Sequence, residues 1–503
     1  MEISGHPISL AQLNALANGN ERIELTDESR ERIRRSRAVV EEILEQGQVI
    51  YGISTGFGKL SDVKIEPNAL RQLQLNLVRS HSCGVGKPLA IPEVRAMIFL
   101  RANVLALGFS GVRVEVVNLL CQMLNRRVYP VIPEKGSVGA SGDLAPLAHL
   151  ALALIGEGES FFENERLASA DALARAGLNP IVLEAKDGLA LLNGTQAMHG
   201  VGGLALFRAK RLARVADVAG AMTLEGLMGT PRAFDPRIQK VRPHPGQIAV
   251  AEHMRALVRQ SEIRESHRAN DPRVQDAYSI RCIPQVHGAA RDALGYVEKI
   301  LEIESAGATD NPLVFPESGD VISGGNFHGA PLALALDFAA IALTDLMSIS
   351  ERRIERIVNP DLSYGLPAFL ARKPGLQSGM MIAQVAAASL LNEAKVLAHP
   401  ASIDNVPTSG GKEDHVSMGM TSAIKLRSIV EDAENLLAIE LLAAAEALEH
   451  RRPLKGGIGV ERAYATVRKY AEPLLEDRAL APDIAAIASA IRAGEFDSEH
   501  EEL

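Results

Sequence analysis

The feature that most constrains the fold is a helical repeat of small aliphatic residues in the second half of the 503-residue chain. Between 422 and 449, apolar residues recur three or four positions apart: Leu426, Ile429, Ala433, Leu436, Leu437, Ala444 and Leu448. The same alanine- and leucine-rich pattern runs through 203–228, 287–306, 330–357 and 377–398. This spacing is typical of amphipathic helices. It predicts five long helices.

The composition indicates how these helices pack. Aromatic residues make up 4% of the chain and tryptophan is absent, so the core must be aliphatic. Small side chains let helices approach closely, which favours a long multi-helix bundle of the all-α class. We find no alternation of strands and helices of the kind that would indicate a doubly wound sheet.

The first part of the chain is less regular. Its predicted helices, at 29–46, 92–107 and 111–125, are divided by glycine-rich loops at 52–58, 84–87 and 136–142. We therefore expect a loop-rich N-terminal region, 1–200, and a region of long helices, 201–503.

Charge and leader patterns limit the class of protein. The net charge is −9 and the pI is near 5.9, which argues against a general nucleic-acid-binding surface. The basic run 30–37 is interpreted as one face of a solvated helix. The N-terminus lacks a basic region followed by an apolar core, so no signal peptide is predicted. The most apolar stretch, 330–349, carries Asp337 and Asp345 and is not expected to span a membrane.

The cysteines point to a reducing compartment. Cys83, Cys121 and Cys282 are widely spaced and form no CxxC pattern, which argues against a disulfide framework or a thiolate zinc site. We therefore expect a cytoplasmic protein without a membrane anchor.

Polar residues concentrate in seven loops, where chemistry is expected if the long helices are scaffold. The loops are "YGISTGFGKL" (51–60), "NLVRSHSCGVG" (76–86), "GSVGASGDLAP" (136–146), "LLNGTQ" (191–196), "QDAYSIRCIPQVHG" (275–288), "ATDNPLVF…ISGGNFHG" (308–329) and "TSGGKEDHVSMG" (408–419).

Three common chemistries are excluded by these loops. The segment 52–59 lacks the glycine spacing of a phosphate-binding loop, and Leu60 replaces the required Ser or Thr. Ser141 lacks the Gly-x-Ser-x-Gly elbow of a hydrolase. The histidines are too dispersed to predict a metal site: His81, His287, His328 and His415.

The string Gly-Ala-Ser-Gly at 139–142 fits a different reaction. If the amide nitrogen of Gly142 attacks the carbonyl carbon of Ala140, a five-membered ring closes through Ser141. Loss of one water from the ring and of a second by β-elimination of the Ser141 hydroxyl leaves a methylidene conjugated to an imidazolone. Glycine suits this step because Gly142 has no Cβ to obstruct its nitrogen and Gly139 permits an unusual bend. The product is a strong electrophile.

This pattern resembles a known family. "GSVGASGDLAPLAHLAL" is similar to the signature of the aromatic amino acid ammonia-lyases, and the similarity extends over nearly the whole chain. The resemblance implies a methylidene-imidazolone (MIO) group, with Ala140 cross-linked to Gly142 and Ser141 converted to dehydroalanine. It implies no metal and no dissociable cofactor, an aspartase/fumarase-like helix bundle, and a homotetramer whose subunits share active sites. The Gly-Ser-Ser-x-Met-Pro loop of the fumarase group itself is absent.

The resemblance also assigns roles to single residues. Tyr51 matches the tyrosine that transfers a proton at the substrate Cβ, although a phenol needs nearby donors or positive charge to serve as a base. Asn193 matches the asparagine that steadies the MIO oxygen or its approach. Tyr278 matches a second active-site tyrosine and Arg281 the arginine that holds the substrate carboxylate, for which a guanidinium fork is well suited. Two further positions match pocket-lining residues, Gln275 and Phe327.

Two positions bear on the substrate. By this resemblance, His81 matches a histidine of the histidine and tyrosine lyases, where the phenylalanine lyases usually have an apolar residue. Glu413 matches a glutamate of the histidine lyases, where the aromatic lyases and aminomutases usually have a glutamine. A carboxylate binds an imidazole N–H well and a bare phenyl ring poorly, so L-histidine is the expected substrate.

Some neighbouring positions depart from the family pattern or leave a role open. Lys412, preceded by two glycines, replaces the usual sequence before Glu413; it either pairs with Glu413 or points to solvent. Cys83 also replaces a commoner small apolar residue. Asp143 either assists the cyclisation or caps the following helix.

The implied reaction is non-oxidative loss of ammonia from L-histidine to give trans-urocanate, the first step of histidine degradation. The electrophile would add to the substrate amine or to its imidazole ring, and the sequence does not distinguish the two. The alternatives are a tyrosine ammonia-lyase, an aminomutase with the same group, and an inactive helical scaffold.

Overall fold

The structure is a computed structural model that describes residues 1–60, 62–269, 271 and 273–497. It divides into two compact units. Unit 1 comprises Met1–Ala205, Glu298–Asp337 and Pro400–Ile424; unit 2 comprises Leu206–Val297, Phe338–His399 and Lys425–Leu503. The sequence predicted consecutive regions with a boundary near 200, whereas each unit combines three segments. The reason is that four unit boundaries fall inside long helices, which carry the chain from one unit into the other several times.

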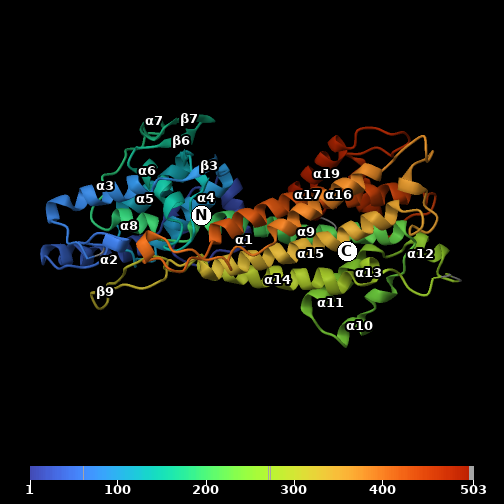
Figure 1. Ribbon diagram of the computed structural model, residues 1–503, viewed down its shortest axis with the longest axis horizontal. Coiled ribbons are helices and arrows are strands. Elements are labelled where there is room, and N and C mark those ends of the chain that lie inside the picture. The colour runs from blue at the N-terminus through green and yellow to red at the C-terminus, as the bar shows by residue number, and fades with distance from the viewer. Residues whose placement is uncertain (61, 270, 272, 498–503) are drawn as a thin grey trace. The chain divides into compact units, whose positions relative to one another are not determined.

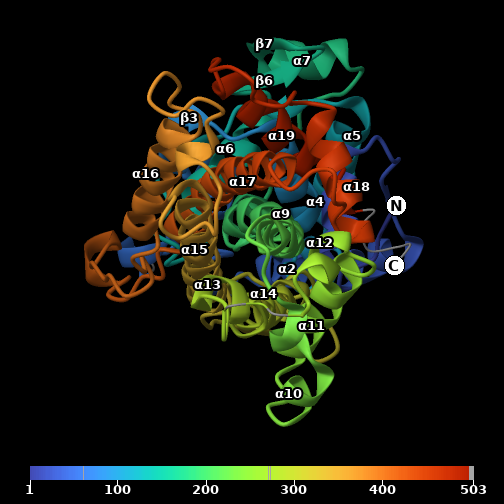
Figure 2. The same cartoon turned by 90° about the vertical axis from the view of Figure 1, so that its right-hand side faces the viewer.

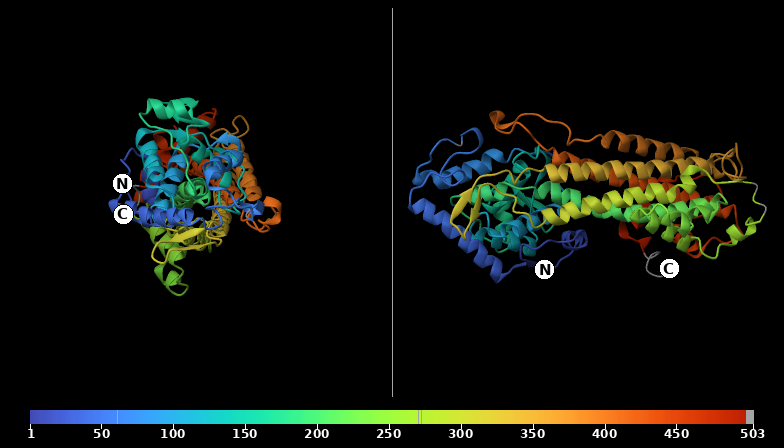
Figure 3. Two further views of the ribbon diagram at one scale, coloured as in Figure 1. Left: turned by 90° about the vertical axis from the view of Figure 1, so that its left-hand side faces the viewer. Right: turned by 90° about the horizontal axis from the view of Figure 1, so that it is seen from below.

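The predicted long helices are present. They are α9 (Gln196–Gly226), α14 (Ile283–Glu304), α15 (Ala330–Val358), α16 (Met381–Leu397) and α17 (Gly419–Glu449). Within unit 2, the long helices run alongside one another (Figure 3). The shorter helices of this unit are α10 (Pro236–Lys240), α11 (Pro245–Leu257), α12 (Glu262–Ser266), α13 (Tyr278–Arg281), α18 (Ile458–Arg468) and α19 (Ala481–Ala493). Of these, α10 and α11 project from the rest of unit 2 (Figure 2).

Unit 1 is also mainly helical. Its own helices are α1 (Leu10–Asn18), α2 (Asp27–Glu45), α3 (Leu70–His81), α4 (Ile91–Leu105), α5 (Val114–Arg126), α6 (Leu144–Leu154), α7 (Ser169–Arg175) and α8 (Asp187–Leu192). Helix α4 forms its centre, with every residue from Glu93 to Leu105 buried. Short 3₁₀ turns lie in the loops of the two units, at Gly58–Leu60, Pro67–Ala69, Pro231–Phe234, Ala368–Leu370 and Ser409–Gly411.

Short strands that the all-α prediction did not include join these helices. Parallel β1 (Glu2–Ile3) and β2 (Glu24–Leu25) form one pair, and antiparallel β3 (Val85–Pro88) and β5 (Pro133–Lys135) another. The antiparallel order β4 (Tyr129–Pro130), β6 (Glu159–Phe162), β7 (Glu165–Ala168) forms a three-stranded sheet, and β8 (Leu313–Phe315) pairs with β9 (Asp320–Ile322). The hairpin β6–β7 packs with α7 (Figure 1). The strands are too short to show period-2 alternation, so the sequence gives no signal for them.

Two groups of charged residues are less solvated than their sequence pattern indicates. In α2, Arg37 is 9% exposed and donates to the carbonyls of Gly111 and Ala185, so the basic run is not a uniformly solvated face. In α17, Glu434 is 1% exposed and pairs with Arg208 at 2.8 Å. Guanidinium groups satisfy these buried sites because their forked N–H groups reach several acceptors at once.

One helix, α15, is long and apolar enough to cross a membrane, and 67% of its most apolar window is buried within the protein. Asp337 in this helix is buried and accepts a hydrogen bond from the Ser402 amide at 2.8 Å.

Candidate active site

A cavity of about 850 Å³ in unit 1 brings together residues from separate loops. Five residues that the sequence singled out line it: Tyr51, Ala140, Ser141, Phe327 and Glu413. They come from four segments that are far apart in the chain. The volume lies within the range of small-molecule sites. The cavity is therefore the candidate active site.

The loop that carries Ser141 is held from outside by backbone contacts. The Val138 carbonyl accepts from the Met418 amide at 2.8 Å. The Gly139 carbonyl accepts from the Gly329 amide at 3.1 Å and from the Ser417 hydroxyl at 2.9 Å. These contacts fix the loop at its start, and the next two residues, Ala140 and Ser141, line the cavity.

The backbone around Gly142 is crowded and requires glycine. Gly142 has φ +72°, and a Cβ added there would lie 2.3 Å from the carbonyl oxygen of Gly194. The next amide, that of Asp143, donates to the same oxygen at 2.7 Å. In the part of the chain that the structure describes, neither the Gly142 N–H nor the Ala140 carbonyl takes part in a hydrogen bond. The two peptide groups that ring closure would join are thus free to react.

Asp143 does not cap the helix that follows it. Although it precedes α6, its side chain makes no capping hydrogen bond there. Its carboxylate accepts from the Ser137 hydroxyl at 2.7 Å and from the Met198 amide, in the first turn of α9, at 2.7 Å. Asp143 therefore fastens the loop to the start of α9. Burial raises the pKa of this carboxyl to about 6, although these hydrogen bonds oppose the shift.

The raised pKa predicts a pH-dependent stability. A carboxyl with a folded-state pKa near 6 and an ordinary value of 3.8 stabilises the fold most below pH 4, and this contribution falls as the pH rises through 6. Relative to Asp143→Asn, which does not titrate, the wild-type free energy of unfolding should drop by about 2 kcal/mol between pH 4 and 7. Urea unfolding at several pH values measures this difference. The exposed Asp171→Asn variant is the control, and a pH-independent difference for Asp143→Asn would contradict the assignment.

Glu413 is in direct contact with Ser141. Its Oε1 accepts from the Ser141 hydroxyl at 2.5 Å, and its Oε2 accepts from the Thr408 hydroxyl at 2.6 Å. Burial opposes ionisation of this carboxyl, but hydrogen bonds from Ser141, Thr408 and Ser409 outweigh it, so the pKa of Glu413 is lowered. The group is an anion at neutral pH.

Lys412 does not contribute to that shift. Its side chain is exposed at the cavity wall, and within the described residues it forms no ion pair with Glu413. Of the two alternatives that the sequence left open, the structure shows the solvent-facing one.

Tyr51 lies in an environment that favours the neutral phenol. Burial raises its pKa, the carboxylates of Glu413 and Asp310 raise it further, and a hydrogen bond involving the Gly58 backbone acts in the opposite direction. The positive charge that a tyrosinate would need is not supplied by these neighbours.

Asn193 is buried just behind the cavity. It donates from Nδ2 to the Asn311 carbonyl at 3.0 Å, and Asn311 itself lines the cavity. The Asn311 segment is anchored by a buried ion pair of 3.0 Å between Lys186 and Asp310. Fully buried ion pairs demand good geometry, so this pair fixes the loop in one position.

His81, at the end of α3, is half-buried and close enough to Glu413 for their charges to interact. Burial lowers the pKa of His81 more than Glu413 raises it, so the ring is neutral at neutral pH. Cys83, two residues later, is exposed.

Two histidines that the sequence left unassigned meet at the cavity. The rings of His328 and His415 stack with centroids 5.7 Å apart. The Nδ1 of His328 accepts from the Ala330 amide at 3.3 Å, so its Nε2 carries the proton that contacts the His415 carbonyl at 3.2 Å. With its ring in this neutral form, His328 connects two of the loops that line the cavity. Their 87-residue separation hides this pairing from the sequence.

Gln275, Tyr278 and Arg281 belong to unit 2 and are not among the residues that line the cavity. Gln275 is exposed, and the side chain of Tyr278 is 71% exposed. The Arg281 guanidinium lies 4.4 Å from the centre of the Tyr278 ring. No carboxylate of the described residues pairs with Arg281.

Known proteins resemble this chain in both fold and sequence. A solved histidine ammonia-lyase from Trypanosoma cruzi superposes with a TM-score of 0.92 at 45% identity, covering 99% of this chain and 94% of that one. A tyrosine aminomutase from Streptomyces globisporus gives a TM-score of 0.94 at 39% identity, covering 99% and 98%. A histidine ammonia-lyase from Anaeromyxobacter sp. strain K is 57% identical over 500 residues, 98% of each chain.

The fold is thus that of the ammonia-lyases and the related aminomutases, and the ammonia-lyase relatives identify the protein as a carbon–nitrogen lyase. The family model described as aromatic amino acid lyase matches residues 8–469. This chain belongs to the aromatic amino acid lyase family.

Proposed function

We propose that this protein removes ammonia from L-histidine to give trans-urocanate, as the first step of histidine degradation. The observation that carries the proposal is the contact between Ser141, in the reactive loop, and Glu413, the carboxylate expected to bind an imidazole. The high identity to a protein named histidine ammonia-lyase supports the same substrate.

The residues at 140–142 fit an MIO group formed from the chain itself. The loop is fixed on both sides, the Gly142 N–H and the Ala140 carbonyl have no hydrogen bond within the described residues, and Gly142 leaves its nitrogen unobstructed. The group would supply an electrophile that no standard side chain provides. No metal is needed. Among the described residues, no three His, Cys, Asp or Glu side chains gather as metal ligands.

Glu413 would bind the substrate ring. While Ser141 keeps its hydroxyl, that hydroxyl occupies Oε1 of Glu413. Its elimination would free Oε1 to accept the imidazole N–H in a charge-assisted hydrogen bond. The hydrogen bonds from Thr408 and Ser409 do not involve Ser141 and continue to favour the charged carboxylate of Glu413 after the elimination.

Tyr51 would handle the proton at the substrate Cβ from the opposite wall. Because its pKa is raised by burial and nearby carboxylates, removal of a proton requires positive charge brought by the substrate or by another subunit. Asn193 supports this wall from behind through Asn311.

A homotetramer with shared sites would complete the cavity, and the long helices would form an aspartase/fumarase-like bundle. Among the residues that the structure describes, none gives Arg281 a carboxylate partner, and Tyr278 is exposed, so both are available to a neighbouring copy. There, Arg281 would hold the substrate carboxylate by a bidentate pair and Gln275 would line the pocket. We place the protein in the cytoplasm, in keeping with its unpaired cysteines.

The activity is tested by incubating the purified protein with L-histidine and following the near-ultraviolet absorbance of urocanate. L-Tyrosine, with measurement of ammonium and of β-tyrosine, covers the lyase and aminomutase alternatives. Product from tyrosine and none from histidine would overturn the proposed substrate.

Glu413→Gln tests the role of the carboxylate. The amide keeps the shape but removes the charge, so kcat/KM for L-histidine should fall about 10–100-fold, the value of a charge-assisted hydrogen bond. The neighbouring Asp414→Asn, which removes a carboxylate from the same cavity wall, should change it less than about threefold. Steady-state kinetics with both variants compare them. An equal loss of kcat/KM in both variants would show that the overall negative charge of the cavity wall, and not the specific contact of Glu413, determines activity.

A further inference from the structure

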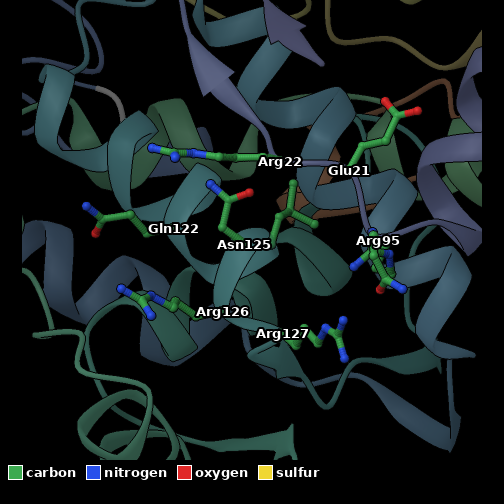
Figure 4. A pocket seen from close by; sticks show the side chains of 9 residues that line it. Glu21, Arg22, Arg95, Gln122, Asn125, Arg126 and Arg127 are labelled. Carbon is green, nitrogen blue, oxygen red and sulfur yellow. The ribbon is translucent and has the colours of Figure 1, made fainter.

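A second cavity of unit 1 lies at the C-terminal end of α5, formed by residues outside the candidate active site. It has a volume of about 530 Å³ and is lined by four arginines and a single acid, Glu21. Figure 4 shows Arg22, Arg95, Arg126 and Arg127 around Asn125 in this arginine cavity. In a chain of net charge −9, such a concentration of positive charge is a local exception.

The most informative member is Arg95, because it is buried without a counter-ion. Its side chain is 5% exposed, and every group of the described residues that it contacts through a hydrogen bond is neutral. Its guanidinium donates to the carbonyls of Leu16, Ala17 and Gly19 at 2.7–3.3 Å and to the Tyr129 hydroxyl at 2.5 Å. These bonds engage its N–H groups with carbonyls at the C-terminal end of α1, whose dipole offsets about half a charge, and no carboxylate of the described residues pairs with Arg95. A buried charge is costly unless an opposite charge is near.

The acids near the cavity do not offset this charge. Glu21 is 64% exposed and lies 4.0 Å from the N-terminal ammonium of Met1, so water and a second cation both weaken its effect on Arg95. Arg22 pairs with Glu24 at 2.7 Å, but the two side chains are 81% and 59% exposed, and exposed pairs contribute little.

Arg126 and Arg127 have exposed side chains without an ion-pair partner in the part of the chain that the structure describes. Arg127 ends α5 with φ 59°, a left-handed conformation usually given to glycine at this position. An arginine here keeps a guanidinium at the cavity at the expense of backbone strain. Both groups have free N–H forks, the geometry that binds phosphoryl oxygens in pairs.

An adjoining aromatic cavity of about 430 Å³ shares Arg126 and Arg127 with the first. Its wall includes Tyr129, Phe161 and Phe162. Tyr129 connects the two cavities, since its hydroxyl contacts Arg95 and its ring lies 5.5 Å from the Arg95 guanidinium. Flat aromatic ligands stack on such side chains, at about 1–3 kcal/mol per ring.

We propose that the arginine cavity binds a phosphoryl group, free or carried on a flat aromatic body that enters the adjoining aromatic cavity. The free N–H forks of Arg126 and Arg127 hold the anion, the charges of Arg22 and Arg95 add to the positive potential, and the phenylalanine and tyrosine rings pack against the body. The ligand class is that of the nucleoside phosphates.

The test measures binding of three probes to the purified full-length protein by calorimetry: inorganic phosphate, adenosine monophosphate and adenosine. We expect adenosine monophosphate to bind at least about tenfold more tightly than phosphate, and adenosine not to bind measurably, because the anion provides the anchor. Affinity should fall as salt rises from low to physiological concentration. Equal affinity for phosphate and adenosine monophosphate would overturn the proposal that a flat body binds in the aromatic cavity. The ligand of the arginine cavity would then be free phosphate.

The double variant Arg126→Gln/Arg127→Gln is expected to weaken adenosine monophosphate binding at least about tenfold. The matched control, Arg34→Gln/Arg35→Gln, removes the same charge from exposed positions of α2 and should leave binding unchanged. Both variants should keep the turnover of L-histidine, which shows that they fold. Unchanged binding in Arg126→Gln/Arg127→Gln, or no saturable binding of either phosphate in the wild type, would overturn the proposal.

A purely structural role for the two arginines gives a different result. As cations at a helix C-terminus they would stabilise α5 whether or not a ligand is present. The stability gained on adding adenosine monophosphate, measured as the rise in Tm, would then be the same in the double variant and the wild type. We expect this rise to be lost in the double variant, because it reflects binding alone.

Discussion

Replacing Ser141 with alanine is expected to abolish ammonia release while the fold remains intact. Alanine has no hydroxyl to eliminate, so the electrophile cannot form even if the ring closes. Because such a group carries the difficult chemistry, the loss in kcat should be on the order of 10³-fold or more. Stability should change by only about 1 kcal/mol, because alanine lacks only a hydroxyl that the mature wild-type chain has also lost by elimination. Urocanate absorbance and thermal unfolding measure the two effects.

Intact mass provides the direct check on Ser141. The wild-type chain should be lighter than its sequence by two waters, and Ser141→Ala should not show this loss. Ser137→Ala is the matched control, because Ser137 lies in the same loop but bonds only Asp143 and the Gly139 amide. It should keep the mass loss and most of the activity. Full turnover by Ser141→Ala would refute the role of Ser141.

The helical part of the fold could be predicted because its signal is local. The 422–449 repeat corresponds to α17, Gly419–Glu449, and the 330–357 repeat to α15, Ala330–Val358. Apolar residues that recur with a period near 3.6 predict a helix with one buried face, even when the segment that packs against this face is not known. The short strands carry no such pattern, since their pairing depends on partners elsewhere in the chain.

The division into units could not be predicted for a related reason. A boundary placed by composition near 200 lies close to the end of the first segment of unit 1, at Ala205. The later segments, 298–337 and 400–424, return to unit 1 because they carry loops of the cavity. Composition records what a segment is made of and not which distant segment it contacts.

The candidate site shows the same limit. The loops around Ser141 and Glu413 were recognised by their residue types, but that these two side chains touch became visible only in three dimensions. Asp143 illustrates the point further. A residue directly before a helix is normally expected to cap it, yet here its carboxylate bonds the first turn of α9 instead, at Met198. The competing partner is 55 residues away and leaves no local trace.

Replacing Gly142 with alanine should be as damaging as replacing Ser141, through the backbone. A residue with a Cβ at φ +72° bears a cost of about 1–2 kcal/mol. In addition, the new Cβ would lie 2.3 Å from the carbonyl oxygen and 2.6 Å from the carbonyl carbon of Gly194, backbone atoms that cannot move aside cheaply. The loop must therefore shift, and a displacement of about 1 Å can cost a reaction about 10²-fold. We expect at least this loss in activity, and a mass that retains one or both waters.

Gly177→Ala separates the two causes in that prediction. Gly177 has nearly the same dihedral, φ +71°, but a Cβ there meets nothing within 4 Å. It thus carries the backbone strain without the clash, and should lower stability by about 1–2 kcal/mol while leaving mass and turnover unchanged. If Gly142→Ala instead behaved like Gly177→Ala, the close approach to Gly194 would have no part in placing the Gly142 nitrogen. If Gly142→Ala instead had the full mass of its sequence, with neither water lost, and no turnover, the close approach of Gly142 to Gly194 would be what brings the Gly142 nitrogen to the Ala140 carbonyl.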